Sequence, residues 1–195
     1  MTPPAIRTFL LATTLLVTAV APASALQIAP LAPADPDDVA SPQAVVDALY
    51  ATVTRAPGEP WDVTRALSLF LPTAHLIANT EQRGGEFVIH SPVEFWDLVQ
   101  GFTEVGGPDD KGFEEEELSN VIHRYGDVAQ VFSTYRKGWW GEEEDLGRGI
   151  NAIQMVWHAG RWWVSSIAWD EEVGGGPIPA EHLGASGEGG EVDGR

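Results

Sequence analysis

The chain has 195 residues, of which 29 are acidic and 11 are basic, so its formal net charge is −18. This balance repels the phosphates of nucleic acids and anionic lipids, which excludes both as partners. The absence of cysteine excludes a disulfide-stabilised scaffold, so stability must come from packing.

The first 25 residues have the pattern of a secretory signal peptide. Arg7 precedes the apolar run Phe9 to Val20, and Ala23-Ser24-Ala25 offers a small-residue cleavage site. The run is shorter than the ~20 residues that span a bilayer, and an uncleaved membrane anchor is the alternative. We expect export to the periplasm or the extracellular space, cleavage after Ala25, and no membrane association of the mature chain.

Composition divides the rest of the chain into three segments. Residues 26–40 are rich in Ala, Pro and Asp and predict a disordered linker, and residues 41–173 predict one domain. Residues 174–195 predict a flexible, Gly-rich acidic tail, although Pro177-Ile178-Pro179 and Leu183 are apolar enough to fold back onto the domain.

Three helices are expected in the first half of the domain. Ser41-Pro42 begins the first helix, which ends at Pro57-Gly58, and a second runs from near Asp62 to Pro72 with Phe70 and Leu71 on its apolar face. Short apolar segments at 75–78 and 87–90, separated by Gly84-Gly85, predict a hairpin. Ser91-Pro92 then begins a third helix.

The last third predicts an antiparallel sheet. Its segments are rich in β-branched and aromatic residues and are joined by tight turns: Val121–Tyr125, Val128–Lys137, Ile150–His158 and Trp162–Trp169. Helices followed by strands indicate an α+β domain with the N-terminal helices packed on one face of a curved, mainly antiparallel sheet. The acidic runs 114–117, 142–145 and 170–172 are interpreted as solvated edges or loops.

This order of elements resembles the nuclear transport factor 2-like superfamily, whose cone-shaped α+β fold includes SnoaL-like cyclases and ketosteroid isomerases. The resemblance covers about residues 41–172 and is clearest in Gly160-Arg161-Trp162-Trp163-Val164 and in the helix that Ser91-Pro92 begins. The stretch from Arg148 to Gln154 is similar to exported, uncharacterised bacterial members. The resemblance implies a pocket at the wide end of the cone.

The reaction does not follow from the resemblance, because this fold hosts both enzymes and proteins that only bind. Ketosteroid isomerases use a carboxylate base on the first strand, with a tyrosine and a protonated acid as donors. The matching stretch here, Ala74 to Asn79, contains no carboxylate. His75 is the candidate that could replace the base, because imidazole titrates near neutral pH.

The five histidines lack metal-ligand spacing, and we expect neither a metal nor another cofactor. Two hypotheses about function remain: an exported protein that binds a small apolar or aromatic ligand, and a lyase or isomerase with His75 as general base. The candidate ligand-binding residues combine a polar group or an aromatic face with an apolar surrounding: Tyr50, His75, Trp96, His123, Tyr135 and Asn151.

The last strand suggests a second subunit. Strict alternation places Trp162 and Val164 on one face of this strand and Trp163, Ile167 and Trp169 on the other, so that both faces of the sheet are substantially apolar. Helices cover one face, and we expect a homodimer to bury the other.

Overall fold

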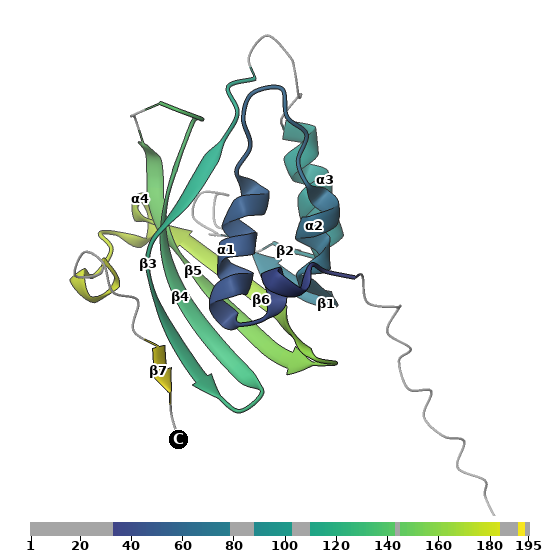
Figure 1. Ribbon diagram of the computed structural model, residues 1–195. Coiled ribbons are helices and arrows are strands. Elements are labelled where there is room, and N and C mark those ends of the chain that lie inside the picture. The colour runs from purple at the N-terminus through teal and green to yellow at the C-terminus, as the bar shows by residue number, and fades with distance from the viewer. Residues whose placement is uncertain (1–32, 79–87, 103–109, 143–144, 184–190, 194–195) are drawn as a thin grey trace, which may run out of the picture.

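The computed structural model describes residues 33–78, 88–102, 110–142, 145–183 and 191–193. It is an α+β domain in which helices cover the concave face of one curved sheet (Figure 1). Helix α1 (Pro42–Val53) lies across the sheet, with α2 (Val63–Ser68) and α3 (Pro92–Phe102) beside it. The predicted fold class is confirmed.

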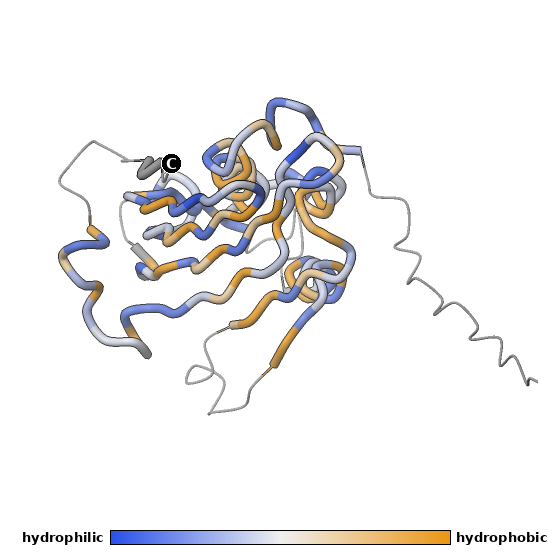
Figure 2. The backbone as a smooth tube through the Cα atoms, turned by 90° about the horizontal axis from the view of Figure 1, so that it is seen from below, coloured by the Kyte–Doolittle hydropathy of each residue, from blue (hydrophilic) through white to orange (hydrophobic). Residues whose placement is uncertain are grey.

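The sheet has the strand order β2-β1-β6-β5-β4-β3-β7. The four long strands form an antiparallel meander: β3 (Glu114–Tyr125), β4 (Val128–Gly138), β5 (Asp145–His158) and β6 (Arg161–Glu171). Strands β1 (Phe70–Ile77) and β7 (Glu191–Asp193) pair in parallel with β6 and β3 respectively, and β2 (Ile89–His90) pairs antiparallel with β1. Hydrophobic and hydrophilic residues alternate along the strands, as a sheet buried on one face requires (Figure 2).

Local sequence explains where the helices begin. The Ser41 hydroxyl accepts from the Ala44 amide at 3.1 Å, with Pro42 as the first helical residue. At α3, Ser91 and Glu94 form a capping box, in which the Glu94 carboxylate accepts from the Ser91 amide at 2.8 Å. The second helix is shorter than predicted, because Phe70 and Leu71 already belong to β1.

Two β-bulges change which side chains face the helices. In β3, Glu117 pairs with Tyr135 and Ser119 with Thr134, so Leu118 is an extra residue. In β6, Ser165 is extra, because Val164 pairs with Met155 and Ser166 with Gln154. The second bulge places Trp162 and Trp169 on the same, concave face, which corrects the alternation expected from the sequence.

Of the three tryptophans of β6, Trp162, Trp163 and Trp169, only Trp163 therefore faces away from the helices. It is buried, with the Arg161 guanidinium 3.3 Å above its ring and its indole N–H donating to the His158 carbonyl at 2.9 Å. The expected homodimer stays a prediction, but Trp169 provides no surface for it.

The two segments that flank the predicted domain are partly ordered. Residues Pro36–Val39 form a 3-10 helix in which Val39 is buried and Asp38 pairs with Arg65 at 2.7 Å, so the prediction of a disordered linker is wrong for residues 33–40. The remainder of that segment lies outside the described residues, as does the predicted Gly84-Gly85 turn.

The tail folds back onto the convex face of the sheet. After the short helix α4 (Glu172–Gly175), the 3-10 turn Ala180–His182 packs on β3 and β4. The His182 carbonyl accepts from the Ser119 and Thr134 hydroxyls at 2.5 and 2.6 Å, and its ring stacks on Phe132. The predicted flexible tail is therefore corrected for residues 174–183, which form a strap on the sheet.

A buried ion pair joins the segment after α1 to the start of β3. Arg55 donates to both oxygens of Asp110, at 2.7 and 3.1 Å, and each side chain is less than 5% exposed. Asp110 also accepts from the amides of Gly58 and Gly112, while the Arg55 guanidinium lies 4.8 Å from the Trp61 ring centroid. The pair thereby holds together the two segments that bear Trp61 and Phe113.

We expect Asp110→Ala to lower the free energy of unfolding by about 3 kcal/mol, because Arg55 would stay buried without a counter-ion. Glu142→Ala is the control, since the Lys111–Glu142 pair is exposed and its loss should cost less than about 1 kcal/mol. Urea denaturation of both variants measures the difference. Equal losses would contradict this account of the buried pair.

Candidate functional site

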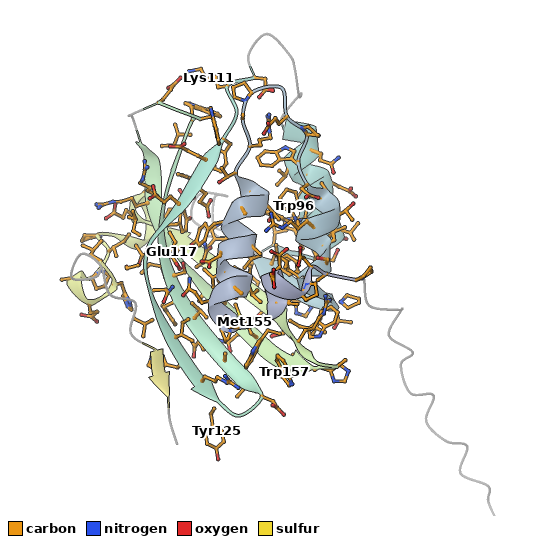
Figure 3. All side chains as sticks on the ribbon, viewed as in Figure 1. Trp96, Lys111, Glu117, Tyr125, Met155 and Trp157 are labelled. Carbon is orange, nitrogen blue, oxygen red and sulfur yellow. The ribbon has the colours of Figure 1, made fainter. Side chains whose placement is uncertain are left out.

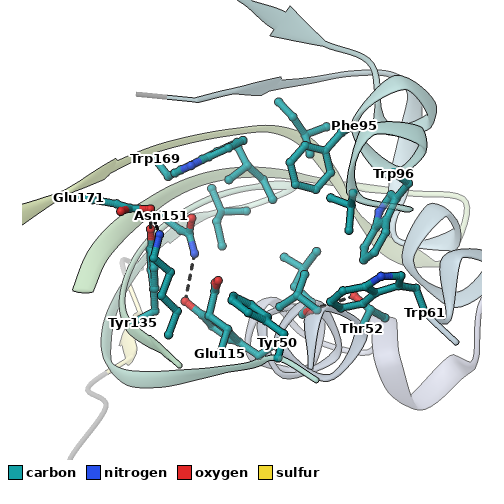
Figure 4. Close-up of a pocket in the computed structure, with 18 of the residues that line it drawn as sticks. Tyr50, Thr52, Trp61, Phe95, Trp96, Glu115, Tyr135, Asn151, Trp169 and Glu171 are labelled. Carbon is teal, nitrogen blue, oxygen red and sulfur yellow. Dashed lines mark hydrogen bonds and ion pairs between the residues drawn. The ribbon is translucent and has the colours of Figure 1, made fainter. Parts of the chain in front are cut away.

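A cavity of about 560 Å³ lies between the helices and the concave face of the sheet. Apolar side chains form most of its wall: Leu49, Val53, Trp61, Phe70, Leu76, Phe95, Trp96, Val99, Phe113, Trp139, Leu146, Ile153, Ile167 and Trp169. Figure 4 shows the polar side chains gathered at one end and the aromatic rings of Phe95, Trp96 and Trp61 at the other.

The aromatic end is a chain of ring contacts. Trp96 lies 5.9 Å from both Trp61 and Phe95, measured between ring centroids, and Phe95 meets Trp169 edge-on at 5.7 Å. These rings come from a loop, from α3 and from β6, so the wall depends on packing between elements distant in sequence. Tilted and edge-on contacts of this kind are favourable beyond the area they bury.

The polar end is formed by two neighbouring rows of paired residues across the sheet. One row runs Glu117, Tyr135, Gly149, Glu171, and the next runs Asn120, Ser133, Asn151, Trp169. Glu115 and Lys137 form the adjoining pair on the same face. The bulge at Leu118 brings the odd-numbered glutamates onto the face that Asn120 occupies.

Gly149 makes room for the Tyr135 ring. A Cβ atom on Gly149 would lie 2.6 Å from the Tyr135 hydroxyl oxygen and 2.5 Å from the Asp170 carbonyl oxygen. The ring can therefore lie across β5 and bring its hydroxyl to 3.5 Å from the Glu171 carboxylate, which also binds the Lys137 ammonium. A hydrogen bond of 3.5 Å is weak, so the Tyr135 hydroxyl can turn to a ligand.

The Glu115 carboxyl is a proton donor or acceptor near neutral pH. Burial among apolar walls raises its pKa from 4.5 to about 7, against the opposing effects of the Lys137 charge and of a hydrogen bond with Asn151; the Glu171 charge raises it further. Burial also raises the pKa of Tyr50 and of Tyr135, so both hydroxyls stay protonated. The polar end therefore holds two O–H groups that can donate to a ligand, those of Glu115 and Tyr135, whereas Asn151 donates to Tyr50 and Lys137 to Glu171.

The structure brings together four of the six residues predicted for the site. Tyr50, Trp96, Tyr135 and Asn151 line the cavity. His75 and His123 do not: both side chains are exposed, and His75 pairs with Ser166 on the convex face of the sheet. His75 and Asn151 thus lie on opposite faces, which corrects the prediction of a shared pocket and removes His75 as a base acting within it.

Sequence reasoning missed the charged residues of the site. Glu115 and Glu171 belong to acidic runs that were expected to be solvated, yet both face the cavity, and Lys137 lies between them. The one signal available in the sequence was spacing. Glu115 and Glu117 are two residues apart, so they would lie on the same face if the strand that follows began before them.

The described residues contain no group of three or more His, Cys, Asp or Glu side chains arranged to hold a metal ion. None of the helices that the structure describes is long and apolar enough to cross a membrane.

Comparisons with known proteins agree on the fold. No protein-family model matches the chain, and no curated protein matches it in sequence. A nuclear transport factor 2-like protein of unknown function from Pseudomonas putida KT2440 superposes with a TM-score of 0.52 at 15% identity, covering 73% of this chain and 89% of that one. A Nostoc punctiforme protein with a cystatin-like fold gives a TM-score of 0.52 at 12% identity, covering 66% and 86%. The chain has the nuclear transport factor 2-like fold, as its sequence predicts.

The raised pKa of Glu115 predicts a stability that depends on pH. Because the folded state holds this proton more tightly than the unfolded state, the stability falls as pH rises from 4.5 to about 7. Glu115→Gln removes the titration, and we expect the variant to be more stable than the wild type at pH 8 by about 2 to 3 kcal/mol. Chemical denaturation at pH 5 and pH 8 measures this. A variant less stable at pH 8 would show that Glu115 is not held protonated.

Proposed function

We propose that the protein binds a small, mostly apolar, ring-containing molecule that carries an acceptor oxygen at one end. The observation that supports this is the division of the cavity into an aromatic end and an end with two donors, the Tyr135 hydroxyl and the protonated Glu115 carboxyl. A volume of about 560 Å³ suits a ligand of drug-like size.

The donors select the oxygen of the ligand. A carbonyl or hydroxyl oxygen that lies between Tyr135 and Glu115 would accept from both, in a site where the apolar walls exclude competing water. Rings of the ligand would meet the faces and edges of Trp61, Phe95 and Trp96. A carboxylate ligand is disfavoured at high pH, because the ionised Glu115 and Glu171 together then outweigh the single charge of Lys137.

Two donors at one oxygen would also stabilise an oxyanion, as an isomerase requires. Such an enzyme needs a base opposite these donors. The buried residues of β1 that face the helices are Phe70, Ala74 and Leu76, none of which is a base. The described carboxylates that line the cavity are Glu115 itself and Glu171, which Lys137 binds. The geometry therefore supports binding better than isomerisation.

The probe 2-acetonaphthone, compared with 2-ethylnaphthalene of the same shape but without the carbonyl, tests this proposal. At pH 6 we expect the ketone to bind about tenfold more tightly, because Glu115 and Tyr135 donate to its oxygen. At pH 8.5 the preference should fall, because an ionised Glu115 no longer donates. Quenching of tryptophan fluorescence measures both affinities.

Two variants test whether the preference for the ketone depends on Glu115 and not on His75. Glu115→Gln keeps a donor at every pH, so its preference for the ketone should not change between pH 6 and 8.5. His75→Gln should bind like the wild type, because His75 lies outside the cavity. Equal affinity for both probes at pH 6, or a loss of binding in His75→Gln, would refute the proposed site.

We further propose that the protein acts outside the cytoplasm, as a homodimer. The support comes from the signal-peptide pattern of the first 25 residues and from the half-buried apolar residues Ile150, Ala152 and Val156 on the convex face of β5. The N-terminal sequence of exported protein should begin at Leu26, and sedimentation at micromolar concentration should give the dimer mass. An N-terminus that retains Phe9 to Val20 contradicts cleavage, and a monomer contradicts the dimer.

A further inference from the structure

Glu117 lies beneath α1 on the concave face of β3, outside the cavity wall (Figure 3). Three donors surround its carboxylate. One oxygen accepts from Asn120 Nδ2 at 2.9 Å and from Gln43 Nε2 at 3.1 Å, and the other accepts from Ser133 Oγ at 2.5 Å. Since a carboxylate only accepts, Glu117 determines the direction of the hydrogen bond with Ser133.

The direction of this hydrogen bond fixes the direction of the next two in the chain of hydrogen bonds, because the hydroxyl groups of Ser133 and Tyr50 each have one proton to donate. Ser133 has one hydroxyl proton and gives it to Glu117, so its oxygen must accept from the Tyr50 hydroxyl, 2.6 Å away. Tyr50 has then used its own proton, and its oxygen accepts from Asn151 Nδ2 at 3.2 Å. The amide of Asn151 is thereby oriented with its NH2 group toward Tyr50. Asn151 also hydrogen-bonds to the Glu115 carboxyl and lowers its pKa, which is the effect of an N–H donor.

We propose that Glu117 is a positioning residue of the ligand site, which acts through Ser133 and Tyr50 to keep the N–H groups of Asn151 directed at Glu115. The consequence for ligands rests on the proposed function, but the arrangement of protons does not. Tyr50 is committed to Ser133 and cannot donate to a ligand, so Tyr135 is the tyrosine that can donate beside Glu115.

The orientation of Asn151 matters because Glu115 is the group that titrates. An N–H donor favours the charged carboxylate, as does the Lys137 ammonium, while burial and the Glu171 charge favour the neutral acid. Tyr50 and Tyr135 are the neutral titratable neighbours. An Asn151 amide turned to present its carbonyl would instead accept from the protonated acid and favour it.

Glu117→Gln should reverse the chain. The amides of Asn120 and Gln43 both donate to one oxygen of residue 117. In the variant, the side-chain oxygen of Gln at position 117 therefore accepts from these two amides, and its NH2 group faces Ser133. Ser133 then donates to Tyr50, Tyr50 donates to the Asn151 carbonyl oxygen, and the Asn151 amide turns. We expect the pKa of Glu115 to rise by about one pH unit.

The sign of this change is diagnostic. Loss of the Glu117 charge acting only through space would lower the pKa of Glu115, because a nearby negative charge disfavours a second one. Titration of the Glu115 side-chain carboxyl carbon by NMR, assigned with Glu115→Gln, measures the shift in the protein without ligand. Glu116→Gln is the matched control, since Glu116 lies on the opposite face and pairs with Arg136.

The Tyr50→Phe background cuts the chain between Glu117 and Asn151. There, Glu117→Gln should no longer raise the pKa of Glu115. Ser133→Ala provides a second route that leaves every carboxylate in place: it deprives the Tyr50 hydroxyl of its acceptor, so that Tyr50 can donate to Asn151, and it should also raise the pKa. The proposal would be overturned if the pKa of Glu115 fell or stayed unchanged in Glu117→Gln and in Ser133→Ala. It would also be overturned if Glu117→Gln raised this pKa as much in the Tyr50→Phe background as in the wild type. Both outcomes are independent of the binding of 2-acetonaphthone.

Discussion

Successive side chains of a β-strand point to opposite faces, and the site exists because two bulges break this alternation. The bulge at Leu118 lets Ile122 and Asn120 face the helices together with Glu117 and Glu115. The bulge at Ser165 does the same for Trp162 and Val164 with Ile167 and Trp169. Without them, Glu115 and Trp169 would lie on the convex face, and the cavity would lose both its titrating acid and one of its aromatic walls.

The charged residues that line the cavity, and Glu117 next to it, are tolerated because of the groups that surround them. Glu171 is held by Lys137 and approached by Tyr135, while Glu117 is surrounded by amide and hydroxyl donors. Glu115 has the least compensation, and it responds by holding its proton near neutral pH. A buried carboxyl kept partly neutral is a familiar way for a protein to present a donor at a site where a charge would be costly.

The sequence predicted the order of the main helices and strands and four of the residues that line the cavity, because these depend on local signals and on periodicity. Ser41-Pro42, Ser91-Pro92 and the tight turns mark the element boundaries locally, and Tyr50 and Trp96 follow from their place on apolar helix faces. The prediction of His75 failed because its face depends on the irregular pairing of β1 with β6. Glu115 was missed for a related reason. The sequence does not show which members of a run of four glutamates face the helices, because that depends on the bulge at Leu118.

The same bulged stretch of β3 also lies at an edge of the sheet. Only Ile122 to Arg124 pair there with β7, whereas the residues from Glu114 onward form the border of the sheet within the described part of the chain. Exposed edges invite strands of other molecules to add to the sheet, and charge together with an extra residue discourages this. The outward Glu114 and Glu116 and the extra Leu118 therefore defend the protein against edge-to-edge aggregation, while the alternate glutamates serve the cavity.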